Sequence, residues 1–129
     1  MIVDSSALIA IIKREPEAAR FRVALETTAD LSMSAANYLE AGIVVDGFRD
    51  PGMSAQLDTI IERSGIVIEP VTLELARAAR RAYRAYGRGS GHWANLNFGD
   101  CFSYALAREK REPLLFKGDD FVHTDLESA

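Results

Sequence analysis

A three-layer α/β/α sandwich around a short parallel sheet is predicted by three features of the sequence. Short apolar runs of strand length alternate with longer segments of helical periodicity. The strand-length runs are apolar at consecutive positions, which is typical of parallel strands covered on both faces. A chain of 129 residues also has the length of one domain, since single cores commonly serve about 100 to 150 residues. We therefore expect residues 1–129 to form a single α/β domain.

The composition excludes several classes of protein. Hydrophobic residues make up 48% and charged residues 26%, enough for a core without disulfides or a structural metal. The single cysteine, Cys101, is typical of a reducing compartment, so we expect a cytoplasmic protein. With no basic N-terminal region and no apolar run of ~18 to 20 residues, we expect neither a signal peptide nor a membrane span. A net charge of −4 indicates that nucleic-acid binding would need a local positive surface.

The first half of the chain alternates between strand and helix. The predicted elements are, in order, a strand at 1–4, helices over 5–14 and 15–28, a strand at 31–34, and helices over 35–48 and 53–64. Ser5 and Ser6 can begin the first helix, Pro16 suits a first helical turn, and Gly65 ends the last helix. In the helix over 35–48, apolar spacing predicts core positions for Leu39, Ile43 and Val44.

The second half adds two strands and two helices. The predicted elements are a strand at 66–68, a helix from the Thr72 cap to Tyr86, a loop over 87–97, a helix over 99–112 and a strand at 114–116. In the helix before the loop, we expect the core to contain Leu75, Ala76, Ala79, Ala82 and Tyr83. The loop is long, and long ordered loops are often functional.

Four separated acids are placed where a parallel sheet binds ligands, at the C-terminal ends of its strands. Asp4 ends the first strand, Glu40 lies on the helix after the second, Asp100 begins the last helix, and Asp119 follows the last strand. Asp4 is the most informative, because a carboxylate after Ile-Val on a buried strand is costly unless it is paired or metal-bound. Any single member of the other three can also be explained as a solvated acid, and Asp100 as a helix N-terminal acid.

A cluster of carboxylates needs a cation to neutralise it. Oxygen ligands suit Mg²⁺, with Mn²⁺ as the alternative, whereas two histidines and one cysteine are too few for an ordinary zinc site. Such ions stabilise the attacking and leaving oxygens of a phosphodiester displacement, so the acids predict nucleic-acid hydrolysis.

Four segments resemble a known family: Ile-Val-Asp-Ser-Ser-Ala-Leu at 2–8, Tyr-Leu-Glu at 38–40, Leu-Asn-Phe-Gly-Asp-Cys-Phe-Ser-Tyr-Ala-Leu-Ala at 96–107, and Leu-Leu-Phe-Lys-Gly-Asp-Asp-Phe at 114–121. In this order they resemble the PIN-domain ribonucleases, specifically the VapC toxins of type II toxin–antitoxin modules. The resemblance covers essentially the whole chain. It implies a PIN-like fold and a Mg²⁺-dependent endoribonuclease that cuts structured RNA, often tRNA. It also implies a homodimer and inhibition by a cognate VapB-like antitoxin whose segment fills the active-site groove.

The resemblance assigns the acidic roles to Asp4, Glu40, Asp100 and Asp119, with Asp4 and Asp100 as metal ligands. Ser6 matches a hydroxyl residue that supports the first acid, although a helix cap explains it equally. The family often has a polar residue in the place of Gly118, so the choice between Asp119 and Asp120 stays open.

Basic residues near the long loop can supply the local positive surface. Arg77, Arg80 or Arg81, Arg84 and Arg88 recur at helical spacing, and Lys117 lies beside the acids. They are candidates for RNA-phosphate binding. The alternative for the arginines is a solvated helix face, and the alternative for Lys117 is that it offsets the charge of the neighbouring acids. His92 and Trp93 suit either stacking on an unpaired base or packing within the loop or against a second copy.

Three other functions are compatible with acids at the end of a parallel sheet. A phosphate-accepting receiver domain needs an acid closing its central strand, where this chain has only Glu69-Pro70, and an Asp-x-Asp phosphatase needs an acid at Ser6. Both are disfavoured. The remaining alternative is a catalytically inactive PIN-like module that binds RNA or a partner peptide in the same groove.

Overall fold

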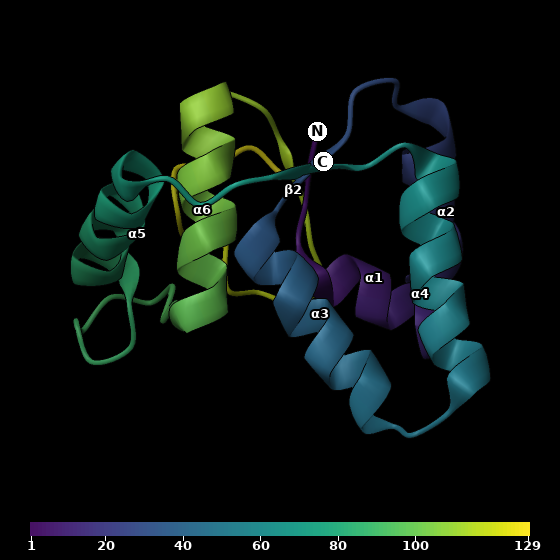
Figure 1. The fold of residues 1–129 in the computed structure, drawn as a ribbon. Helices are drawn as coiled ribbons and strands as arrows, with labels where there is room; N and C mark the ends of the chain where they lie inside the picture. Colours follow the sequence, from purple (N-terminus) through teal and green to yellow (C-terminus); the bar gives the residue numbers. More distant parts are fainter.

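A four-stranded parallel sheet forms the centre of the computed structural model, which describes residues 1–129 (Figure 1). Its strands are short and lie in the order β3-β2-β1-β4. They span β1 Ile2–Val3, β2 Ser32–Ser34, β3 Val67–Glu69 and β4 Leu114–Leu115. Ile2 is in register with Ser32 on one side and with Leu114 on the other. Strands far apart in the sequence therefore end at one common edge.

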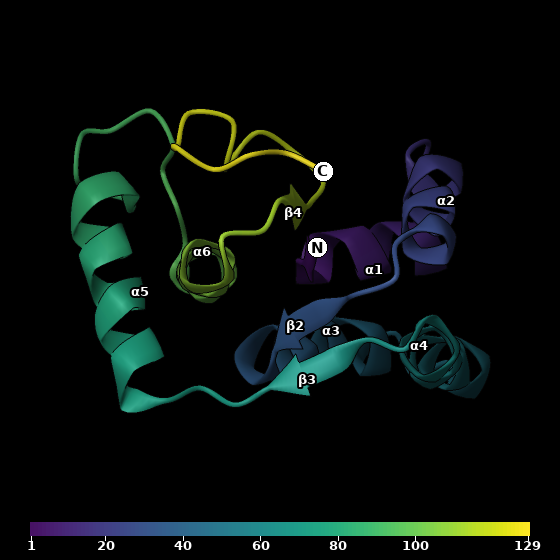
Figure 2. The same cartoon turned by 90° about the horizontal axis from the view of Figure 1, so that it is seen from above.

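Six helices cover the two faces of this sheet (Figure 2). One face carries α1 Ser5–Ile12, α2 Ala18–Thr27, α3 Ala35–Gly47 and α4 Pro51–Ser64, and the other carries α5 Leu73–Tyr86 and α6 Phe98–Lys110. None of them combines the length and apolar character needed to cross a lipid bilayer.

The core lies in two clusters, one on each face of the sheet. Successive strand residues point to opposite faces, so Val3 and Leu115 pack with α1 to α4 while Ile2 and Leu114 pack with α5 and α6. All four side chains are buried. This alternation explains why the strands are apolar at consecutive positions, and it confirms the predicted three-layer α/β/α arrangement.

The helix boundaries follow local capping signals, with small departures from the prediction. Helix α2 begins at Ala18 because Glu15, Pro16 and Glu17 form a turn whose Glu15 carbonyl accepts from the Ala18 N–H. Helix α4 begins at Pro51 because the Asp50 side chain caps its first turn. The last strand ends at Leu115, one residue earlier than predicted.

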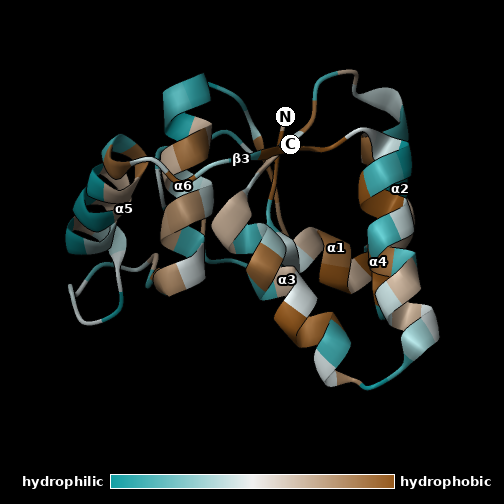
Figure 3. Ribbon diagram, viewed as in Figure 1, coloured by the Kyte–Doolittle hydropathy of each residue, from teal (hydrophilic) through white to brown (hydrophobic).

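Helix α3 turns a different face to the core from the one predicted. Leu39, Ile43 and Val44 are 60%, 64% and 38% exposed, so the prediction that they face the core is wrong. The buried positions are Asn37, Ala41 and Val45, which recur every four residues. Figure 3 shows apolar segments along this helix. Because apolar residues occur on both faces, their periodicity could not identify the inner one.

In helix α5, the predicted core positions Leu75, Ala79 and Ala82 are buried. Ala76 and Tyr83 are instead exposed, contrary to the prediction. Both lie on the side of α5 that borders a surface groove against α6.

Substitution of Phe21, in α2, tests the packing of the core. Its side chain is fully buried, so Phe21→Ala should lower the free energy of unfolding by roughly 3–5 kcal/mol in urea denaturation, through lost burial and the cavity left behind. Val23, two residues further along, is 57% exposed, and Val23→Ala should change stability by no more than about 0.5 kcal/mol. Equal effects of the two substitutions would contradict this packing.

Candidate active site

Asp4 is buried at the C-terminal end of β1, where it caps α1. One carboxylate oxygen accepts from the Ser6 N–H at 3.0 Å, and the other accepts from Ser103 Oγ at 2.5 Å. The Asp4 N–H donates to the Leu115 carbonyl at 3.0 Å. One residue therefore ties β1, α1, β4 and α6 together.

Asp100 lies in the first turn of α6 and is also buried. Its Oδ2 accepts from the Asn97 N–H at 3.0 Å, while its own N–H donates to Asn97 Oδ1 at 2.9 Å. This reciprocal capping box fixes the start of α6 and the position of the carboxylate. Asp100 is therefore an N-terminal acid of α6, as one of the two sequence interpretations predicted. The burial of its carboxylate indicates a further role.

Glu40 on α3 approaches the same region from the other side. Its Oε1 accepts from Ser5 Oγ and, at 3.4 Å, from Asn37 Nδ2. Its carboxylate lies against the backbone of Gly99, where any Cβ atom would collide with it. Gly99 therefore permits Glu40 to lie next to the Asp100 turn.

The turn after β4 brings one of two adjacent acids to Asp100. Half-buried Asp120 interacts with the Asp100 carboxyl, whereas exposed Asp119 lines a separate hollow with Glu17 and Arg20. Gly118 before them has a φ of 97°, a conformation that side-chain-bearing residues rarely adopt. This backbone requirement explains why glycine occupies that position. The electrostatic influence of Asp120 on Asp100 favours Asp120 over Asp119 as the fourth acid.

Two fully buried polar residues complete the site without having been predicted. Ser103 supports Asp4, and Asn37 Nδ2 donates to the Gly99 carbonyl at 2.9 Å. The Asn37 Oδ1 atom is buried with no hydrogen-bond partner. Each lies one helical turn from a predicted acid, three residues from Asp100 or Glu40, and that spacing was the available sequence signal.

The electrostatics of the site penalise negative charge. Burial raises the pKa of the Asp4 carboxyl, and nearby Glu40 raises it further, against hydrogen bonds from Ser103 and Ser6 that lower it. Burial also raises the pKa of Asp100 to about 8, against the opposing hydrogen bond from Asn97, and nearby Asp4 and Asp120 raise it further. None of these acids forms an ion pair with a basic side chain.

This donor set fits a hard divalent cation. No three acidic, histidine or cysteine side chains form a ready metal-ligand cluster. Mg²⁺, however, is usually bound through one or two carboxylates and keeps several waters. Asp4 and Asp100 can provide those carboxylates, and a cation there would relieve the charge penalty that burial imposes on both.

Ser6 and Lys117, two residues predicted to assist the acids, both make contacts between the start of the chain and the segment after β4. Ser6 Oγ accepts from the Lys117 N–H at 2.9 Å, so it links the start of α1 to the segment after β4. The Lys117 ammonium pairs with Glu15 and Glu17 and with none of the four predicted acids, so the charge it offsets lies outside the predicted site.

The arginines of α5 and the following loop divide between two grooves. Arg80 and Arg88 line the groove against the first turns of α6, whereas Arg81 lines the opposite one. Arg77 and Arg84 are exposed and line neither. Of the two alternatives at 80 and 81, the structure therefore places Arg80 on the side of Asn97 and Phe98.

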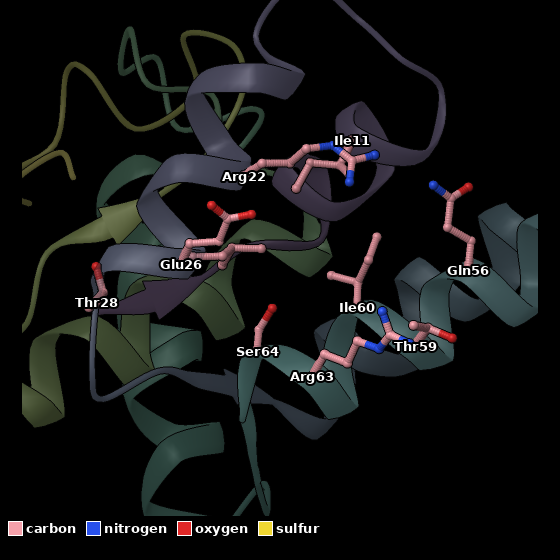
Figure 4. Close-up of a pocket in the computed structure, with 10 residues that line it drawn as sticks. Ile11, Arg22, Glu26, Thr28, Gln56, Thr59, Ile60, Arg63 and Ser64 are labelled. Atoms are coloured by element: carbon pink, nitrogen blue, oxygen red, sulfur yellow. The ribbon is translucent and has the colours of Figure 1, made fainter.

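A further cleft lies between α2 and α4, with Ile11 of α1 among its lining residues (Figure 4). Arg22, Glu26 and Arg63 project from its walls. None of the four predicted acids lines it. This cleft is therefore separate from the acidic site.

Comparisons with known proteins agree with this geometry. Residues 1–127 match the family model described as PIN domain. The chain is 57% identical over 129 residues to VapC ribonuclease Mb0625 of Mycobacterium bovis and to ribonuclease VapC28 of Mycobacterium tuberculosis, covering all of this chain and 97% of each relative. It is 48% identical to ribonuclease VapC42 of Mycobacterium tuberculosis, covering all of this chain and 98% of that relative.

Solved structures share the fold at lower sequence identity. Mycobacterium tuberculosis VapC20, described as a sarcin–ricin loop cleaving toxin, superposes with a TM-score of 0.78 at 16% identity over 99% of this chain and 97% of its own. A toxin–antitoxin complex from Klebsiella pneumoniae gives 0.69 at 18% identity, over 96% and 92%. The chain belongs to the PIN-domain family, and within it to the VapC ribonucleases.

Gly99→Ala tests the approach of Glu40 to the Asp100 turn. The added methyl collides with the mobile end of a side chain, so we expect Glu40 to move and the fold to persist. If Glu40 takes part in cleavage as the sequence predicts, its displacement should lower the rate of RNA cleavage by roughly 100-fold, with little change in melting temperature. The control is Gly47→Ala, since a Cβ at Gly47 meets no atom within 4 Å. Equal cleavage by both variants would contradict the placement of Glu40.

Proposed function

We propose that this protein is a Mg²⁺-dependent endoribonuclease, the toxin of a type II toxin–antitoxin module, with Mn²⁺ as an alternative ion. The observation that carries the proposal is the pair of buried carboxylates, Asp4 and Asp100, with raised pKa values and no basic partner. Such a pair is unfavourable for folding alone and favourable for holding a divalent cation. The family membership of the chain supports the same chemistry.

In this mechanism Asp4 and Asp100 would hold the cation at the C-terminal ends of the strands. When bound, Mg²⁺ supplies charge stabilisation at a phosphodiester and lowers the pKa of a water molecule. Ser103 and the Ser6 N–H orient Asp4, and the capping box orients Asp100. Glu40 and Asp120, at the margins of the pair, would orient the hydrolytic water, and the carboxylate of one of them would take up its proton. We assign the fourth acidic role to Asp120 rather than Asp119 on the basis of its interaction with Asp100.

The substrate we propose is structured RNA, with tRNA as the leading class. The relatives at 57% identity are named ribonucleases, and the structural neighbour VapC20 is described as cleaving the sarcin–ricin loop. The unpaired arginines of α5 supply a local positive surface on a chain whose net charge is −4. The site of action would be the cytoplasm.

Two protein partners complete the proposal. A cognate VapB-like antitoxin would neutralise the enzyme by placing a segment in the active-site groove, and one structural neighbour is described as a toxin–antitoxin complex. A second copy of the chain would cover the outer face of α3, where Tyr38, Leu39, Ile43, Val44 and Phe48 are exposed. Exposed apolar side chains on one helix are typical of an interface rather than of a solvated surface.

Substitution of the metal-holding acids tests the proposed chemistry. Asp4→Asn and Asp100→Asn should each lower Mg²⁺-dependent cleavage of RNA by at least about 100-fold, because the ion supplies several kcal/mol of transition-state stabilisation. Circular dichroism should show that both variants remain folded. Wild-type cleavage by both variants would contradict the metal site. A wild-type protein that binds RNA without cutting it would favour the inactive binding module.

The two adjacent acids after β4 provide a matched comparison. Asp120→Asn should lower the cleavage rate by roughly 10-fold or more, since Asp120 lies against Asp100. Asp119→Asn, one residue away and exposed in a separate hollow, should leave the rate within about twofold. The reverse order would return the fourth acidic role to Asp119.

A further inference from the structure

A groove between α5 and the first turns of α6 has no role in the mechanism above. Its lining residues include Arg80 and Tyr83 of α5, Arg88 and Asn97 of the connecting segment, and Phe98 and Phe102 of α6. No acidic side chain lines it. It is therefore an aromatic hollow with positive charge at its rim, although the chain as a whole is negative.

The aromatic side chains of this groove present open ring surface. Phe98 is 79% exposed, and its ring meets Phe102 edge to face with centroids 4.9 Å apart. On the facing wall, the Tyr83 hydroxyl donates to the Arg88 carbonyl at 2.9 Å, which fixes the end of α5 against the loop. The rings of Tyr83, Phe98 and Phe102 line one hollow, and contiguous exposed apolar surface of this kind is typical of a binding site.

The polar groups at the rim are free to bind. Neither Arg80 nor Arg88 forms an ion pair. Asn97 uses its Oδ1 atom to cap α6, and its Nδ2 makes no hydrogen bond within the protein. Two guanidinium groups and an amide donor thus surround an aromatic surface, a combination that matches a base flanked by phosphates.

The groove is continuous with the acidic site through one turn of helix. Phe98 precedes Gly99, whose backbone contacts Glu40, and lies two residues before Asp100. Asn97 belongs to both sites, because it lines the groove and forms the capping box with Asp100. A strand of RNA with its phosphodiester at the acids would therefore have a neighbouring nucleotide within reach of the groove.

We propose that the α5–α6 groove binds an unpaired nucleobase of the RNA substrate, with the base on Phe98 and the adjoining phosphates on Arg80 and Arg88. This inference rests on the proposed ribonuclease function and specifies how its substrate is held. It requires the nucleotide beside the cleaved bond to be unstacked, so the preferred sites are loops and bulges in structured RNA.

Charge complementarity favours RNA over a second copy of the chain in this groove. A symmetric contact would bring two further guanidinium groups towards a rim that has no acid to pair with them. The phosphates of RNA instead supply the missing negative charge. The apolar outer face of α3, which has no such cluster of arginines, is the better candidate for contact between copies.

Binding of two single-stranded probes tests the proposal independently of cleavage. The full-length protein, in EDTA at low ionic strength, is titrated into a fluorescein-labelled 12-nucleotide oligouridylate or an abasic phosphodiester strand of equal length. By fluorescence anisotropy, the wild type should bind the oligouridylate at least about fivefold more tightly than the abasic strand, as expected for one stacked base. The ratio of these two dissociation constants is the quantity compared between variants. Phe98→Ala should reduce this ratio to below about twofold, and Phe98→Tyr should retain it.

Matched substitutions separate stacking from general charge effects. Val23→Ala shortens an exposed apolar side chain of α2, outside the groove, and should leave the ratio unchanged. Arg80→Ala should weaken binding of both strands by a similar factor and by more than Arg81→Ala, which lies on the opposite side of α5.

The proposal is overturned if Phe98→Ala keeps the wild-type ratio, or if the wild type binds neither strand or does not discriminate between them. Light scattering identifies the competing occupant: Phe98→Ala that converts a dimer to a monomer while retaining the ratio assigns the groove to a second copy. A wild type that shows the ratio but fails to cleave RNA with Mg²⁺ would refute the nuclease function and leave the base site standing.

Discussion

Asp4 is the residue at which burial and charge conflict most directly. Its carboxylate is removed from water at the end of β1, and its hydrogen bonds come from Ser103 on α6 and Ser6 on α1. The Asp4 backbone is bonded to Leu115 of β4. Because no basic side chain neutralises it, dipoles alone oppose the cost of its charge in the metal-free protein. Four elements thus converge on a group whose favourable partner is a cation.

Asp100 and Glu40 lie close to Asp4 and are held in place by the first turn of α6 and by α3. Asp100 lies within the electrostatic reach of Asp4, and the capping box that starts α6 fixes its orientation. Gly99 keeps the same turn narrow enough for Glu40 to approach from α3. The first turn of α6 therefore positions the carboxylates of Asp100 and Glu40, and its outward side chains, Asn97 and Phe98, open into the α5–α6 groove. Metal binding and the proposed base binding would share one rigid helical turn.

The sequence was most informative where one physical rule dominated. Consecutive apolar strand residues predicted the covered parallel sheet, and the acid after Ile2-Val3 predicted a polar group at its edge. The outer face of α3 was misassigned because its apolar residues obey helical spacing without packing in the monomer. The sequence could not decide whether Asp119 or Asp120 points towards the site, because the direction of each side chain depends on a turn with Gly118 at positive φ. The roles of Ser103 and Asn37 depend on contacts across 99 and 62 residues of sequence, which local patterns do not contain.

Charge on the buried acids destabilises the fold until a cation binds, and thermal unfolding measured against pH reports this cost. Folded Asp100 has a pKa of about 8 and an ordinary value of 3.8, so the native state holds a proton that the unfolded state releases. Without divalent cations, stability should therefore fall as pH rises from about 4 to about 8 and level off above. Asp100→Asn should flatten this slope, and Mg²⁺ should raise the melting temperature of the wild type at pH 8 but not that of the variant. Equal slopes, with equal responses to Mg²⁺, would show that Asp100 neither holds this proton nor binds the ion.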